Sequence, residues 1–123
     1  MLKQQGDVLF LRLRTATAAP GLRRLPANEH GLHVLALGEA TGHSHTASAQ
    51  SCALIDAPPE QLFTLDELLR DFESYDGKLL EVLETTTIEH QEHGALVLEP
   101  GLYAIGIVRE WDYTQHENRR VAD

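Results

Sequence analysis

Hydrophobic and polar residues alternate in several short runs of this chain, and a period of two residues is typical of β-strands with one buried face. The clearest run is Leu32–Leu37, which ends at Gly38. The same pattern predicts five further strands, at residues 7–13, 48–56, 78–88, 94–98 and 102–108. Pro100 and Gly101 stand between the last two, and Pro followed by Gly favours a tight turn.

One segment, residues 64–74, has the spacing of an amphipathic helix. Thr64 and Glu67 form a capping box at its start, followed by an apolar stripe at intervals of three and four: Leu65, Leu68, Leu69 and Phe72. Thr114 and Glu117 form a second capping box and predict a short C-terminal helix or turn. We therefore expect one mostly β domain over residues 1–123, a small β-barrel or sandwich with one α-helix on its surface.

Composition and charge exclude several classes of protein. The chain of 123 residues, 42% hydrophobic and 24% charged, suits one globular domain. No run approaches the ~18 apolar residues of a membrane span, and residues 8–11 are too short for a signal-peptide core, so we expect no membrane association and a cytoplasmic location. The net charge is −9, and residues 56–93 carry all of it. Such a surface repels phosphate, which argues against nucleic acid as a partner.

Seven histidines give the chain its candidate chemistry, and four of them form two close pairs. His43 and His45 are two apart, so they share one face of a strand and can hold one metal ion. His90 and His93 are three apart, so both face one site only if the chain turns there. We predict a divalent metal, such as zinc, iron or nickel, bound by His43, His45 and His93, with His90 as a fourth ligand or an orienting group.

A histidine that ligates a metal needs a partner for its second ring nitrogen. Four residues near the histidine pairs are candidates for this role: Ser44, Gln50, Glu89 and Glu92. Three protein ligands with an open position would suit a metal-dependent enzyme that takes a small-molecule ligand. Cys52 is the single cysteine, so it forms no disulfide within the chain, and its apolar neighbours predict a buried, inert thiol.

Two other interpretations remain open. Histidines beside glycine in loops are often only solvated, and a cluster of unligated histidines can instead bind an anion or a partner near the ordinary pKa of ~6.5. The domain would then be a non-catalytic interaction module whose acidic surface, residues 56–92, meets a basic protein. The oligomeric state cannot be inferred from this pattern.

The segment from Gly38 to His45 resembles the first motif of the cupin superfamily, small β-barrels that hold a metal through His-X-His, a glutamate and a distant histidine. Here Gln50 stands in the glutamate window, and Ala104 stands where the second motif has its histidine. The resemblance implies a cupin-like barrel with a metal on His43 and His45 and a distant ligand from His90 or His93. The wider set Gly-His-X-His, His-X-Glu-His and Pro-Gly-X-Tyr is similar to a group of small uncharacterised bacterial and phage proteins, which implies no function.

Overall fold

The computed structural model describes residues 1–15, 18, 20–37, 44–61 and 67–108. The described residues form ten strands and two short helical segments. In chain order these are β1 (Leu2–Gln5), β2 (Val8–Arg12), β3 (Arg23–Leu25), β4 (Leu32–Leu37), β5 (Ser44–Ser48), β6 (Cys52–Asp56), the 3₁₀ turn η1 (Pro59–Gln61), α1 (Glu67–Arg70), β7 (Tyr75–Val82), β8 (Thr86–Ile88), β9 (Leu96–Leu98) and β10 (Gly101–Ile107).

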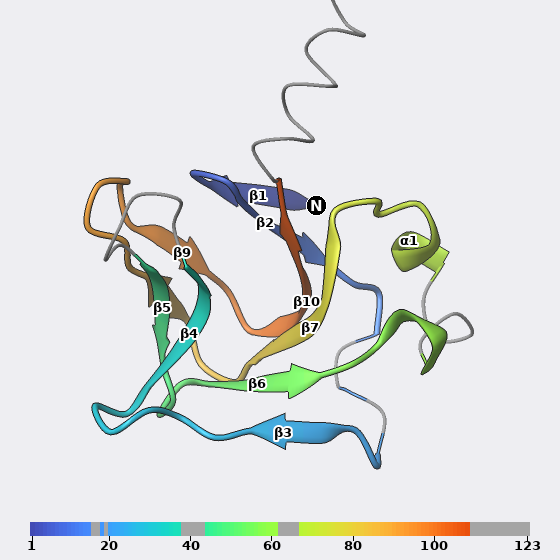
Figure 1. Ribbon diagram of the computed structural model, residues 1–123, viewed down its shortest axis with the longest axis horizontal. Helices are drawn as coiled ribbons and strands as arrows, with labels where there is room; N and C mark the ends of the chain where they lie inside the picture. Colours follow the sequence, from blue (N-terminus) through green and yellow to red (C-terminus); the bar gives the residue numbers. More distant parts are fainter. Residues whose placement is uncertain (16–17, 19, 38–43, 62–66, 109–123) are drawn as a thin grey trace, which may run out of the picture.

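Six of the strands form one antiparallel sheet in the order β1-β2-β10-β7-β6-β3 (Figure 1). The other four pair as two hairpins, β4-β5 and β8-β9. A bridge between Thr46 and Glu89 joins these hairpins, with N···O distances of 3.0 and 2.9 Å. The large sheet keeps two separate edges, β1 and β3, so it does not close into a barrel. The fold is therefore mostly β, as the alternation predicts, and resembles a small sandwich.

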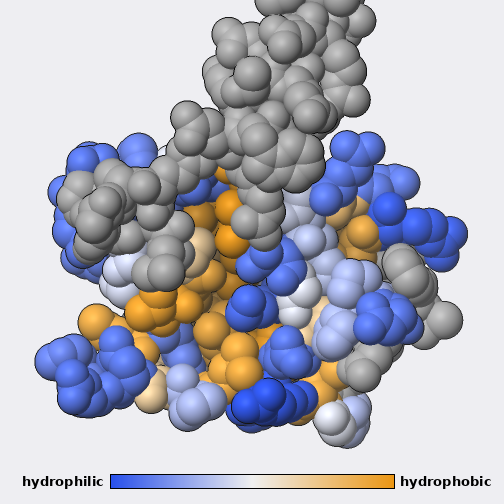
Figure 2. Space-filling model, viewed as in Figure 1, coloured by the Kyte–Doolittle hydropathy of each residue, from blue (hydrophilic) through white to orange (hydrophobic). Residues whose placement is uncertain are grey.

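The core follows from the alternation of side chains along the central strands. On β7 and β10, Leu80 pairs with Tyr103 on the face toward the hairpins, and Leu79 pairs with Ala104 on the opposite face. All four side chains are at most 1% exposed. Burying an aliphatic or aromatic side chain of this size contributes about 1.5–3 kcal/mol, so these two layers provide much of the driving force for folding. On the face in Figure 2, apolar side chains reach the surface across the middle of the molecule.

Two predicted elements are shorter than expected. The strand expected over 78–88 is two strands, β7 and β8, because the chain bends at residues 83–85 and passes from the large sheet to the hairpin β8-β9. The helix expected over 64–74 covers only Glu67–Arg70, with residues 62–66 outside the described part of the chain. It ends in tight turns, in which the N–H of Phe72 bonds to Leu69 O and that of Tyr75 bonds to Phe72 O. The C-terminal capping box also lies outside the described residues.

The N-terminal hairpin was not expected, and it has direct consequences for the site. β1 and β2 pair from Leu2↔Leu11 to Gln5↔Val8, which leaves Gly6 and Asp7 as a two-residue turn. Gly6 has φ +60°, and Asp7 is not in the positive-φ region, as in a type II′ turn with glycine at its first central position. The predicted strand 48–56 is also wrong at its start, because residues 49–51 turn between β5 and β6. The strand β3 was not among the predicted strands.

A clustered set of histidines at the edge of the sandwich

Three of the four candidate histidines lie side by side. The ring centroid of His90 is 4.3 Å from that of His45 and 4.5 Å from that of His93, and the rings of His45 and His93 are 6.2 Å apart. His45 comes from β5, whereas His90 and His93 come from the connection between β8 and β9. His43 lies outside the described residues. The structure thus brings together His45 and His90, which are 45 residues apart in the chain.

Local structure explains why these side chains converge. His45 and Ala47 alternate inward on β5 and are 0% and 1% exposed. The bridge between Thr46 and Glu89 places the end of β8 beside this strand. The chain then bends over residues 91–93, and the Nδ1 atom of His90 accepts hydrogen bonds from the backbone N–H of Glu92 (3.0 Å) and of His93 (3.3 Å). The bend lets two histidines three residues apart face the same site.

The buried ring of His45 is held by two side chains of the N-terminal turn. Its Nδ1 atom lies 2.8 Å from Oε1 of Gln5, and its Nε2 atom lies 3.1 Å from Oδ1 of Asp7. The amide nitrogen of Gln5 donates to Ile88 O at 2.8 Å and to Gly94 O at 2.9 Å. Those carbonyls only accept hydrogen bonds, so the oxygen of this amide must face His45.

These contacts leave His45 between two acceptors. Gln5 Oε1 and the Asp7 carboxylate each accept a hydrogen bond, whereas a neutral imidazole has a single N–H to donate. Burial lowers the pKa of His45 as the largest effect; the hydrogen bond to Asp7 opposes this, and the charge of His90 adds to the lowering. The neutral form is therefore favoured near neutral pH, and one of the two acceptors then lacks a hydrogen.

Sequence reasoning missed Gln5 and Asp7 and expected other partners for the ring. The backbone N–H of Ser44 donates to Gln91 Oε1 at 3.0 Å, and Gln50 is exposed in the turn after β5. The missing signal was the two-residue Gly-Asp turn, which marks a hairpin when two strands flank it. Without that hairpin, neither Gln5 nor Asp7 could be placed near β5.

In this arrangement the donor atoms do not converge as a metal site would require. Among the described residues, no group of three or more His, Cys, Asp and Glu side chains is placed to hold a metal ion. The ring of His93 is exposed and packs on the turn, since a Cβ atom at Gly6 would lie 2.4 Å from its Nε2 atom. The metal ligation predicted for His43, His45, His90 and His93 therefore stays a prediction.

Two other features are less suited to a site. Cys52 is 2% exposed, and burial raises the pKa of its thiol to about 11, which agrees with an inert side chain.

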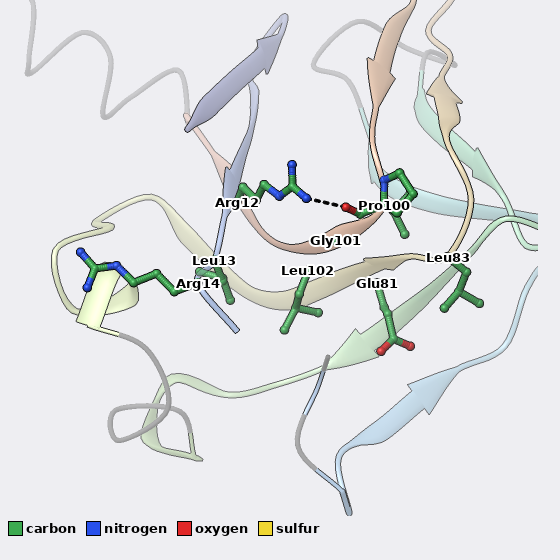
Figure 3. A pocket seen from close by; sticks show the side chains of 9 residues that line it. Arg12, Leu13, Arg14, Glu81, Leu83, Pro100, Gly101 and Leu102 are labelled. Atoms are coloured by element: carbon green, nitrogen blue, oxygen red, sulfur yellow. Dashed lines mark hydrogen bonds between the residues drawn. The ribbon is translucent and has the colours of Figure 1, made fainter. Parts of the chain in front are cut away.

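A cavity of about 320 Å³ lies where β2 and β7 end and β10 begins (Figure 3). Arg12 at its rim donates to Pro100 O at 2.6 Å, and the carboxylate of Glu81 is paired with Arg24 at 3.0 Å. Arg12 and Glu81 therefore already have partners inside the protein.

Comparisons with known proteins give a family but no activity. Residues 4–108 match a domain of unknown function (DUF8820). A search of curated proteins found no match, and neither did a search of solved structures. No helix in the described part of the chain is long and apolar enough to cross a membrane. The matched region contains Gln5, Asp7 and the three clustered histidines, and the chain belongs to the DUF8820 family.

Proposed function

We propose that this domain binds one divalent transition metal ion, such as zinc, iron or nickel, at the histidine cluster. Nε2 of His45 and Oδ1 of Asp7 supply the first two donors, and His93 and His90 turn toward the ion to complete the set. His43 is a further candidate ligand from outside the described residues. Imidazole and carboxylate donors together suit these metals.

The observation that carries the proposal is the pair of acceptors around His45. In the tautomer that donates Nδ1–H to Gln5 Oε1 at 2.8 Å, neutral His45 turns the lone pair of Nε2 toward the carboxylate of Asp7 at 3.1 Å. Two electron-rich atoms at this distance attract a cation. A second proton on the ring would serve as well, but burial lowers the pKa of His45 and disfavours that form. A metal ion satisfies both atoms while the imidazole stays neutral.

The spacing of the rings supports the same proposal. A metal bound at 2.0–2.1 Å lies about 3 Å from an imidazole centroid, so two rings on one tetrahedral ion are roughly 5 Å apart. The three separations here, 4.3, 4.5 and 6.2 Å, bracket that value. His93 is exposed and can rotate in its place over the Gly6–Asp7 turn with little repacking. His90 has to break two backbone hydrogen bonds to offer Nδ1, so it is the weakest of the proposed ligands.

The test is metal analysis of the purified chain of residues 1–123, followed by titration of chelator-treated protein with ZnCl₂, NiCl₂ or ferrous iron. We expect one ion per chain, and loss of binding in His45→Ala and in the pair His90→Ala/His93→Ala. His30→Ala is the matched control, because His30 is exposed in a turn outside the histidine cluster, where its Nε2 atom lies 3.5 Å from Oε1 of Glu29.

A wild-type chain that takes up none of these ions, and whose melting temperature does not change when they are added, would refute the proposal. The acidic surface predicted over residues 56–92 would then become the leading candidate, as a docking surface for a basic protein partner. Glu84, Glu89 and Glu92 are exposed there, whereas Glu81 is buried against Arg24.

A further inference from the structure

Gln5 is a buried polar side chain, 3% exposed, that makes three hydrogen bonds to the histidine cluster and its connecting segment. We infer that Gln5 is the positioning residue of the metal site: its amide selects Nε2 of His45 as the nitrogen offered to the ion and fixes the segment that carries His90 and His93. The inference rests on the proposed function.

The first step is the choice of nitrogen on His45. Because the amide N–H groups of Gln5 are committed to Ile88 O and Gly94 O, only its oxygen can face His45. That oxygen is buried and lies 2.8 Å from Nδ1, whereas the Asp7 carboxylate is 24% exposed to water and lies 3.1 Å from Nε2. We therefore assign the ring hydrogen to Nδ1, which leaves the lone pair of the neutral ring on Nε2. Metal-bound histidines commonly use such a contact on the second nitrogen, which fixes the ring orientation and raises its basicity.

Without Gln5, the hydrogen of His45 would move to the other nitrogen. The Asp7 carboxylate would then be the remaining acceptor beside the ring, so His45 would donate Nε2–H to it. Nε2 would then be blocked, and a metal would have to displace that hydrogen first. Gln5 therefore prevents an ordinary histidine–aspartate hydrogen bond from closing the site.

The second step is the link to the connecting segment. The two acceptors of the Gln5 amide, Ile88 O and Gly94 O, lie just before and just after the bend that carries His90 and His93. The bridge between Thr46 and Glu89 holds only the start of this bend. One side chain thus sets the position of His45 relative to both histidines of the other segment, and binding of an ion should be coupled to the order of residues 89–94.

The variant Gln5→Met tests this, because methionine has a similar length but neither donates nor accepts these hydrogen bonds. Gln4→Met is the matched control, because Gln4 is exposed on the same strand and its amide donates to Gly6 O at 2.8 Å rather than to the histidine segment. We expect Gln5→Met to bind metal 10–100-fold more weakly, the range typical for partners of metal ligands, and Gln4→Met to bind as the wild type does.

A purely structural role for Gln5 would lower stability without changing the ring. Long-range ¹H–¹⁵N NMR of the histidine rings at pH 7.5 separates these cases: we expect His45 as the Nδ1–H form in the wild type and in Gln4→Met, and as the Nε2–H form in Gln5→Met. If Gln5→Met does not fold, the wild-type spectrum alone decides, since an Nε2–H form of His45 there would overturn the inference.

The outcomes also separate this inference from the proposed function. A wild-type chain that binds no metal refutes the proposed function, and with it the role of Gln5 in that site. If the wild type and Gln5→Met bind an ion with the same affinity, the metal site stands and the positioning role is wrong.

Discussion

Replacement of Gly6 by alanine should separate the metal site from the stability of the fold. A Cβ atom at this position would lie 2.4 Å from Nε2 and 2.6 Å from Cδ2 of His93. The ring must move by about 1 Å to regain the ~3.5 Å of an ordinary non-bonded contact. Metal–nitrogen bonds tolerate deviations of only about 0.2 Å, so a displacement of this size should weaken binding by at least the ~10-fold expected for a disturbed ligand.

The same substitution also strains the backbone, and that effect needs its own control. Gly6 has φ +60° at the first central position of a type II′ turn, where an L-residue costs roughly 1–3 kcal/mol. Gly31 has φ +73°, and a Cβ atom there would meet nothing within 4 Å. Gly31→Ala should therefore carry a similar backbone cost without displacing a histidine.

Urea unfolding and metal titration of both variants complete the experiment. We expect both to lose roughly 1–3 kcal/mol of unfolding free energy, and only Gly6→Ala to lose metal affinity, to a degree comparable with His93→Ala. Equal metal affinities in Gly6→Ala and Gly31→Ala would refute the reasoning, because His93 would then not contribute to binding from its place against the turn.

Two further predictions concern the fold itself. His33 is 5% exposed on β4, and burial lowers its pKa while a hydrogen bond to the backbone of Cys52 opposes the shift. The unfolded chain therefore takes up a proton first as pH falls below ~6.5, so the free energy of unfolding of chelator-treated protein should be steady above that pH and decrease below it. The decrease should be smaller in His33→Leu. Urea titrations at pH 7.5 and 5.5 measure this, and an equal decrease in both proteins would contradict it. Gly106→Ala should lower the free energy of unfolding by about 1–3 kcal/mol through overpacking, because its Cβ atom would lie 2.5 Å from Cζ of Phe72. Adding the second substitution Phe72→Leu should recover part of this loss in thermal unfolding. No recovery would locate the strain elsewhere.

The histidine cluster was partly predictable from sequence because its histidines come in short pairs. His-X-His and His-X-X-His spacings pointed to β5 and to the segment after β8, and the structure places the described members of both pairs together. The first cupin motif points to the same pairs, but the closed barrel implied by that resemblance is not formed, since the large sheet ends at β1 and β3. The amide beside His45 belongs to Gln5 rather than to Gln50.

Alternation of apolar residues was enough to predict the mostly β character and the strand Leu32–Leu37, because a period of two is a local property of a strand with one buried face. It could not predict that residues 78–88 divide between two sheets, since the side-chain pattern does not record which neighbour a strand pairs with. Tertiary structure alone decided that Gln5 and Asp7 lie on either side of the His45 ring. Those contacts join positions about 40 residues apart in the chain, and only the docking of the N-terminal hairpin against β5 and β8 brings them within hydrogen-bonding distance.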